Sequence, residues 1–330
     1  MTSLLGANAG TGATLEIRKG WLHGECSSHK TGMVELKIDN LQITYLPLVA
    51  DADTAGSRFT FPLSQSLVSS LPSEYTATVA LPCGTETTME GAAAFGSGDG
   101  SLASKLANGY MVSTKAGYLF KPPASENGWK ERIHTAYSKA RAAINEINAV
   151  SGLFVAYGSL LGQVRSGDFI AHDDDFDAGI FLEADTPGEA AIHYYRIVNT
   201  LRERGHKVTC PKSHMGNFHL YIPDLPPVDV FLFFYRNSTR ELCSYNLAYV
   251  CEKDTILPLR QGSLSGKAVL IPNKADELLA ATYGEYWRTP DPYFQWNITT
   301  RQDLWNCGYR TASRAISCNE DIPEFEDPWL

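Results

Sequence analysis

The sequence has no long hydrophobic run and no recognisable export signal. No stretch reaches about 18 uninterrupted apolar residues, the length that a membrane-spanning helix requires. The start, MTSLLGANAGTGATLEIRKGW, lacks the basic and apolar regions of a signal peptide. We therefore expect a cytoplasmic protein with no integral membrane segment, at most peripheral to a membrane. An anchor removed from the chain would leave the same pattern.

Cysteine and positive charge are also scarce. The seven cysteines are widely scattered and form no CxxC pair, which argues against a disulfide framework and against a zinc knuckle. Lysine and arginine number 28 against 37 acidic residues, so the formal net charge is −9. This balance argues against a nucleic-acid partner bound through its phosphate backbone. A small anionic substrate remains compatible, since one or two arginines and a metal ion can hold a pyrophosphate.

Length and composition predict a globular protein of two domains. The 330 residues are 44% hydrophobic and 20% charged, enough to form a sizeable core. We expect a disordered N-terminus over residues 1–13, a β-rich accessory domain over 14–107 and a catalytic domain over 108–330. Alternating strands between about 15 and 82 predict a small β-sandwich. The Gly- and Ser-rich stretch 84–107 shows little periodicity and is expected to be a linker or mobile loop.

The second half alternates between helical and strand patterns, which predicts an α/β arrangement there. With the β-rich first half, we expect the whole chain to belong to the α+β class. A helix is expected from Asn127 or Ser125 to about Gly152, with an apolar stripe formed by Ile133, Tyr137, Ala140, Ile144 and Ile147. Strands are expected at 153–158, 176–184, 207–211, 218–223 and 228–235. Further helices are expected at 158–167, 188–204 and 273–287. These elements predict a mixed sheet with flanking helices.

Four carboxylates crowd together just before an apolar run: Asp173, Asp174, Asp175 and Asp177. If a strand begins here, its period of two places the first, third and fourth on one face. Such close like charges either raise each other's pKa or take up a cation. Oxygen ligands suit Mg²⁺ or Mn²⁺ rather than zinc. A solvated acidic turn is the alternative, but the apolar flanks favour a metal site.

Asp229 lies inside the otherwise apolar strand VDVFLFF. An unpaired carboxylate buried there would cost several kcal/mol, so it needs a partner. We predict that Asp229 is the third metal ligand, beside Asp175 and Asp177. The alternative is a strand-edge aspartate that caps the loop after Pro226 and Pro227.

Substrate contacts are predicted at the turn before the acidic motif. The glycine of Gly158-Ser159 lets backbone N–H groups approach a phosphate, and the serine hydroxyl and the following helix N-terminus can accept its charge. Arg165 either forks onto a pyrophosphate or pairs with Asp168. Three histidines are candidate bases or donors, or else satisfied core residues: His172, His214 and His219. Of these, His172 is counted among the substrate-binding candidates.

The segment YGSLLGQVRSGDFIAHDDDFDAGIFLE resembles the signature of the LicD and fukutin family of the nucleotidyltransferase superfamily, which includes fukutin-related protein and bacterial homologues. The later segments VDVF and TYGEYW extend the resemblance over roughly residues 130–295. The family implies a nucleotidyltransferase fold and transfer of a phospho-alcohol (phosphocholine, ribitol phosphate, glycerol phosphate or a sugar phosphate). The donor would be CDP-linked and the acceptor a glycan hydroxyl, as in the synthesis of capsule and other cell-surface polysaccharides.

The resemblance also implies roles for single residues. Gly158 and Ser159 would touch the donor phosphate, and the three aspartates predicted as ligands would bind metal. One of those ligands, or Asp173, would act as general base. Two departures from the family are visible: Ala171-His172 replaces a usual Pro-Trp, which leaves specificity open, and the cysteine cluster of human fukutin-related protein is missing, which removes zinc. Nucleotidyl transfer and an inactive glycan-binding protein are the alternatives.

Overall fold

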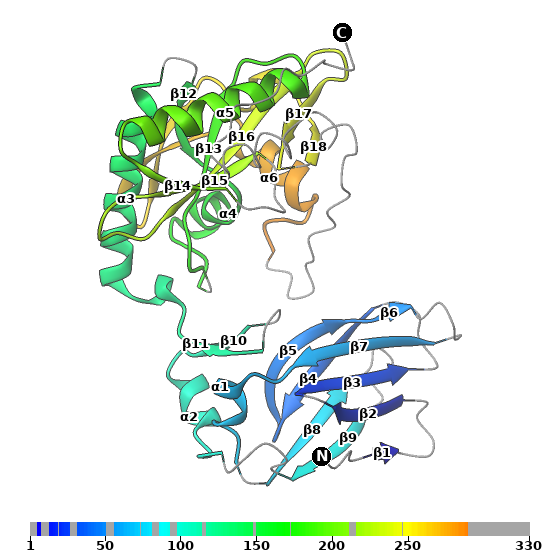
Figure 1. Ribbon diagram of the computed structural model, residues 1–330. Coiled ribbons are helices and arrows are strands. Elements are labelled where there is room, and N and C mark those ends of the chain that lie inside the picture. The colour runs from blue at the N-terminus through cyan, green and yellow to red at the C-terminus, as the bar shows by residue number, and fades with distance from the viewer. Residues whose placement is uncertain are drawn as a thin grey trace. The chain divides into compact units, whose positions relative to one another are not determined.

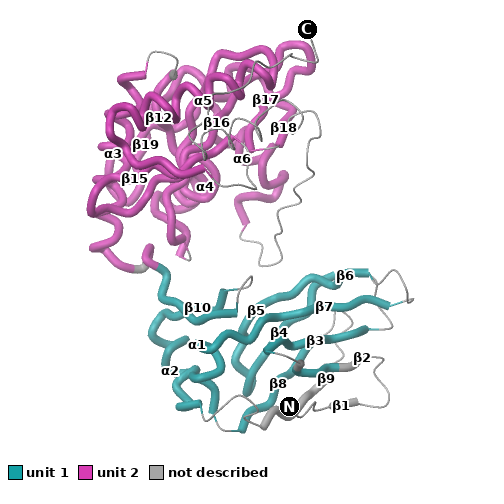
Figure 2. Tube along the Cα trace, viewed as in Figure 1, with its two compact units in different colours: residues 1–122, 292–294 teal, residues 123–291, 295–330 magenta. Residues whose placement is uncertain are grey.

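The chain divides into two compact units. The computed structural model describes residues 5–7, 13–18, 20–26, 32–50, 56–72, 74–80, 86–92, 98–113, 117–147, 150–171, 173–210, 216–245 and 247–289. Unit 1 ends at Pro122 and unit 2 begins at Pro123 (Figure 2). The division lies later than the expected 107/108, because Val112 is buried in the core of unit 1 and Leu119 packs against it.

Unit 1 contains two antiparallel sheets that share one hydrophobic core. The first sheet has the order β1 (Leu5–Ala7), β2 (Ala13–Arg18), β3 (Trp21–Cys26), β7 (Ser57–Pro62) and β6 (Val49–Ala50). The second has the order β5 (Leu41–Pro47), β4 (Met33–Ile38), β8 (Glu74–Ala80) and β9 (Glu86–Ala92). Leu22 and Phe61 from the first sheet join Leu36 and Val79 from the second in the core. In each sheet, the alternate apolar side chains predicted from the sequence therefore point toward this shared core.

Two described parts of the stretch 84–107 form regular elements that its sequence does not predict. Residues 86–92 form β9, which pairs with β8 from Glu86 opposite Ala80 to Ala92 opposite Glu74. Residues 102–107 form the short helix α2 (Leu102–Ala107). Pairing at a sheet edge uses main-chain groups and needs no hydrophobic alternation, so the periodicity of the side chains could not reveal this strand. Unit 1 also contains α1 (Gln65–Val68) and the hairpin of β10 (Met111–Val112) and β11 (Leu119–Phe120).

Unit 2 is built on a mixed sheet, as predicted. Its path runs through β12 (Val150–Val155), β13 (Asp177–Leu182), β16 (Val228–Arg236), β15 (Asn217–Tyr221) and β14 (Lys207–Thr209) (Figure 1). β13 and β16 are parallel, whereas the other neighbours are antiparallel. The far end of β16 pairs with β17 (Glu241–Ser244), which pairs with β18 (Leu247–Val250). β19 (Arg260–Leu264) and β20 (Lys267–Ile271) form a separate hairpin.

Helices pack against both faces of this sheet. On one face, Tyr137 of α3 (Asn127–Asn145) stacks on Phe176 with ring centroids 4.8 Å apart, and Tyr194 of α5 (Pro187–Glu203) contacts Phe218. Figure 1 shows α5 lying across the strands. On the other face, Tyr157 at the start of α4 (Tyr157–Ser166) contacts Phe231, and α6 (Ala275–Tyr283) packs beside α4.

The entry helix of unit 2 matches its predicted stripe but ends early. All five predicted stripe residues are buried. The helix ends at Asn145, and Gly152, its expected end, instead lies within β12 with φ +107°. The pairing register of β12 shifts between Val150 and Leu153. Glycine fits such an irregularity because it tolerates positive φ, so here it marks a kinked strand rather than a helix end.

Membrane-spanning helices and disulfide bonds were not expected from the sequence. In the part of the chain that the structure describes, no helix combines the length and the apolar character needed to cross a membrane. Four cysteines lie there, and all are free: Cys26, Cys210, Cys243 and Cys251. The other three cysteines lie outside the described residues.

Candidate metal centre

The parallel pairing of β13 and β16 brings two of the predicted ligands together. Asp177 lies directly opposite Asp229 in this register, so both side chains leave the same face of the sheet. Asp175 lies two residues before Asp177, in the bend that precedes the strand. One carboxylate oxygen from each of the three residues lies within 4.8 Å of the others. The structure therefore brings together the three carboxylates that the sequence selects.

Without a cation, the negative charges of these carboxylates are disfavoured by burial and by one another. Burial, followed by the charges of Asp229 and Asp174, raises the pKa of Asp175 to about 6. Burial, followed by the charges of Asp175 and Asp229, raises the pKa of Asp177 well above its usual range. Half-buried like charges of this kind favour uptake of a positive ion. Three carboxylate oxygens form a donor set that fits Mg²⁺ or Mn²⁺.

The turn between β12 and α4 fixes Asp177 from three directions. The N–H of Gly158 donates to Oδ2 of Asp177 at 2.8 Å, and the N–H of Asp177 donates to Oγ of Ser159 at 3.0 Å. The N–H of Ala156 donates to the Asp177 carbonyl at 3.0 Å. Ser159 is 1% exposed. Gly158 and Ser159 thus hold the candidate ligand in place, and their contact with a donor phosphate stays a prediction.

Gly158 also has a steric reason to be glycine. A Cβ at this position would lie 3.0 Å from Oδ2 of Asp177 and 3.7 Å from Oδ1 of Asp173. Any larger residue would therefore press on the acidic cluster. The sequence motif Gly-Ser before Asp-Phe-Asp is explained here by packing around a carboxylate.

Aromatic side chains border the carboxylates. The ring of Tyr157 lies 4.6 Å from that of Phe231, and its hydroxyl hydrogen-bonds Ser244 at 3.0 Å and Tyr249 at 3.1 Å. Burial, followed by the nearby charges of Asp177 and Asp229, raises the pKa of Tyr245, which packs edge-on against Phe231. The sequence did not select these tyrosines, because the turn after β17 approaches the site only in the folded sheet.

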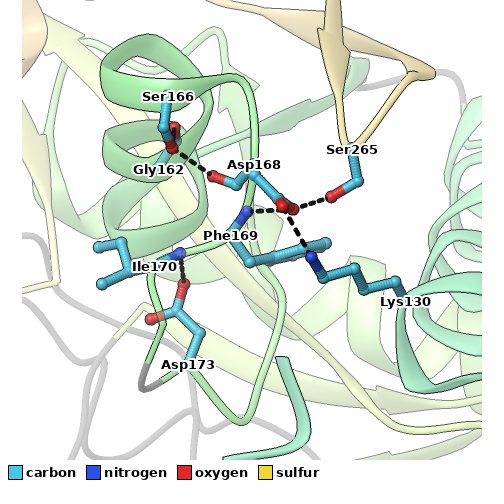
Figure 3. Close-up of polar contacts among 8 residues, drawn as sticks. All are labelled: Lys130, Gly162, Ser166, Asp168, Phe169, Ile170, Asp173 and Ser265. Atoms are coloured by element: carbon cyan, nitrogen blue, oxygen red, sulfur yellow. Dashed lines mark hydrogen bonds and ion pairs between the residues drawn. The ribbon is translucent and has the colours of Figure 1, made fainter. Parts of the chain in front are cut away.

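The loop between α4 and β13 is organised by Asp168 (Figure 3). Its carboxylate accepts hydrogen bonds from Nζ of Lys130 at 2.7 Å, from the N–H of Phe169 at 2.9 Å and from the hydroxyl of Ser265. Three separate segments therefore meet at one side chain. This fixes the loop that leads into the acidic motif.

Asp173 lies beside the three clustered carboxylates rather than among them. Its Oδ2 accepts a hydrogen bond from the N–H of Ile170 at 3.1 Å, as Figure 3 shows. Burial, followed by the charge of Asp175, raises the pKa of Asp173 to about 7. A carboxyl that titrates near neutral pH is suited to accept a proton. Its assignment as general base stays a prediction.

Arg165 does not pair with Asp168, one of the two contacts suggested by the sequence. Its guanidinium donates to the carbonyls of Trp287 and Thr289, the latter at 3.3 Å. Asp168, the alternative partner, is paired with Lys130 instead. Arg165 therefore ties α4 to the segment after α6 in this structure. A contact with pyrophosphate stays a prediction.

Of the three candidate histidines, His219 faces the site. Its Nδ1 lies 2.5 Å from Oδ1 of Asp229, and this hydrogen bond is the main reason why the pKa of His219 is raised. It lies opposite Asp229 in the antiparallel pairing of β15 and β16. The core-residue alternative therefore does not describe His219. His172 and His214 lie outside the described residues.

Comparison with known proteins addresses the resemblance directly. Residues 152–274 match the model of a family described as LicD/FKTN/FKRP, nucleotidyltransferase domain. The matched segment contains the turn at Gly158 and all three clustered carboxylates. No curated protein matches the chain. The family match confirms the resemblance found in the sequence.

Proposed function

We propose that this LicD-family protein is a metal-dependent phosphotransferase, which moves a phospho-alcohol from a CDP-type donor to a glycan hydroxyl. The family supports a phosphotransferase or glycan-modifying role. The observation that carries the proposal is the convergence of Asp175, Asp177 and Asp229 within 4.8 Å. Crowded carboxylates at the N-terminus of a helix can place a cation beside a donor's phosphates.

Each part of the site has a role in this reaction. Asp175, Asp177 and Asp229 would hold Mg²⁺ or Mn²⁺, which when bound neutralises charge on phosphate oxygens. Gly158 and Ser159 keep Asp177 oriented. Asp173, or one of the ligand carboxylates, would accept the proton of the attacking glycan hydroxyl. The hydroxyl oxygen forms a bond to the β-phosphorus of the donor, the bond from that phosphorus to the bridging oxygen breaks, and CMP leaves.

The test is a transfer assay with CDP-linked donors, a glycan acceptor and Mg²⁺. We expect Asp177→Asn to abolish transfer without unfolding the protein. Asp174→Asn is the matched control, because Asp174 is an exposed member of the same acidic run and lies outside the cluster. We expect its activity to remain close to that of the unaltered protein. Full turnover by Asp177→Asn would contradict the proposal.

The mass of the product distinguishes the rival reactions. An acceptor that gains a phospho-alcohol supports the proposal, whereas a gained nucleoside monophosphate indicates attack on the α-phosphorus. Glycan binding without any donor turnover would instead support an inactive glycan-binding protein. The donor alcohol is identified by which CDP-linked compound is consumed.

The two units receive separate assignments in this proposal. We assign unit 2 to the nucleotidyltransferase fold and the two sheets of unit 1 to a β-sandwich accessory domain. The shared core of these two sheets supports the second assignment. The four free cysteines are compatible with a reducing compartment, and a cytoplasmic location stays a prediction.

A further inference from the structure

His219 occupies a defined place beside the candidate metal centre. It faces Asp229 across the β15–β16 pairing, and Asp229 faces Asp177 across the β16–β13 pairing. Three polar side chains thus lie in one row on three adjacent strands. The side chains of His219 and Asp229 are 29% and 15% exposed, so their contact is partly shielded from water.

The contact anchors one carboxylate oxygen of Asp229. Oδ1 of Asp229 lies 2.5 Å from Nδ1 of His219, and one oxygen of the same carboxylate lies within 4.8 Å of oxygens of Asp175 and Asp177. Asp177 is held in a similar way, because its Oδ2 accepts the N–H of Gly158 at 2.8 Å. One anchored oxygen restricts the rotation of a carboxylate side chain, and this reduces the entropy that ordering it around an ion would cost.

We propose that His219 is a positioning residue, which orients Asp229 for cation binding through its Nδ1–H. This inference rests on the proposed metal site. His219 acts through the carboxylate and not as a ligand. The nitrogen engaged with Asp229 is specifically Nδ1, so side chains that place an N–H there should replace it, and others should not.

The test measures Mn²⁺ binding to the full chain at a fixed pH of about 8, by the electron paramagnetic resonance signal of free Mn²⁺. We expect His219→Ala to weaken binding by about 10- to 100-fold, the range for loss of a hydrogen-bond partner of a metal ligand. His219→Asn carries an amide nitrogen close to the position of Nδ1 and should restore most of the affinity. His219→Gln carries its amide farther out, near Nε2, and should not.

A matched control comes from the opposite face of the sheet. His193 lies on α5, which contacts Phe218 on the face away from His219, so His193→Ala should leave Mn²⁺ binding unchanged. If His219→Ala fails to fold, the comparison of His219→Asn with His219→Gln decides. Equal binding by these two variants would overturn the inference, as would unaltered binding by a folded His219→Ala.

The outcomes separate this inference from the proposed function. An unaltered protein that binds Mn²⁺, together with a His219→Ala variant of equal affinity, overturns the role of His219 alone. Failure of the unaltered protein to bind Mn²⁺ overturns the metal site and the role of His219 with it. Loss of binding in Asp177→Asn confirms that the measured ion occupies the carboxylate cluster.

Discussion

The carboxylates of unit 2 are placed where burial opposes their charge. Asp177 is held opposite Asp229 by the pairing of β13 and β16 and by the turn at Gly158, and Asp175 lies two residues earlier, with a carboxylate oxygen in the same cluster. A fold arranged for stability alone would separate or neutralise such groups. Their closeness supports the proposed metal site.

The first prediction concerns stability without metal. Burial raises the folded-state pKa of Asp173 to about 7 and that of Asp175 to about 6, and it raises the pKa of Asp177 well above its usual range. An acid with a raised folded-state pKa binds protons more tightly in the native state. Stability should therefore fall as pH rises through these pKa values, and should be regained as pH falls toward about 4.

Thermal unfolding in a chelator, from about pH 5.5 to about pH 8, measures this effect. We expect Tm to decrease by several degrees, because about 1 kcal/mol moves Tm by about 2–4 °C in a domain of this size. Asp177→Asn should flatten the dependence and raise Tm at pH 8, and Mg²⁺ should raise Tm of the unaltered protein. A Tm that rises with pH in the absence of metal would contradict the expected sign.

The candidate ligands could be predicted from the sequence because two simple rules identify them. A period of two puts Asp175 and Asp177 on one face, and the apolar strand around Asp229 makes its carboxylate conspicuous. The partners of Arg165 and the proposed role of His219 could not be predicted from the sequence by these rules. Both depend on which strand or segment lies beside them, and that is decided by tertiary pairing.

At the scale of elements, the turn that enters α4 determines the geometry of the centre. Tyr157 opens the helix with φ +39°, a conformation that is uncommon for a large side chain. The next residue, Gly158, gives its N–H to Asp177, and a Cβ there would lie 3.0 Å from Oδ2 of that carboxylate. The turn and the Asp177 side chain therefore pack directly against each other.

The second prediction is that Gly158→Ala weakens Mn²⁺ binding by at least about 10-fold, a cost typical of a displaced metal ligand. The added methyl would lie 3.0 Å from Oδ2 of Asp177 and would push that carboxylate aside. Binding is measured as for the histidine variants, and Tm reports the fold.

Gly167→Ala is the matched control for this change. Gly167 ends the same helix with φ +71°, and a Cβ there would meet nothing within 4 Å. We expect a loss of about 1 kcal/mol in the free energy of unfolding, from the strained conformation, with unchanged Mn²⁺ affinity. If both alanine variants bound Mn²⁺ equally well, the steric argument for Gly158 would fail.

Elements with strong periodicity were predictable, and those defined by pairing were not. α3 and α5 follow their apolar patterns closely, because a buried face repeats every 3.6 residues. β16 was predictable as a continuous apolar run, which is typical of a strand buried on both faces. β9 lies in a stretch of small and polar residues, and its pairing with β8 comes from main-chain groups. β17 to β20 were missed for a related reason: they are short strands in hairpins, with few alternating positions each.

At the scale of the whole molecule, the two units have separate cores. Leu36 and Phe61 belong to one hydrophobic cluster, and Ile180 and Phe233 belong to another. The proposed metal ligands all lie in unit 2. A cation should therefore stabilise unit 2 directly, because binding to the native state alone shifts its unfolding equilibrium.

The third prediction follows from this division. Calorimetry of the full chain should show two unfolding transitions, and Mn²⁺ should raise the temperature of one of them. An ion concentration of 100 times Kd corresponds to about 2.7 kcal/mol of added stability. Asp177→Asn should abolish the shift and so identify the transition of unit 2. A single transition, or equal shifts in two, would show that the units unfold together.

The pairing of β13 with β16 also determines when the three carboxylates can come together while the chain is synthesised on the ribosome. Asp175 and Asp177 emerge early, but Asp229 is far later in the chain and joins them only when the parallel pair closes. Closing such a long loop is slow compared with forming a helix or hairpin. An incomplete nascent chain therefore offers two carboxylates without the third. The centre can be completed only after the sheet has formed, so its assembly reports that the strands have found the correct register.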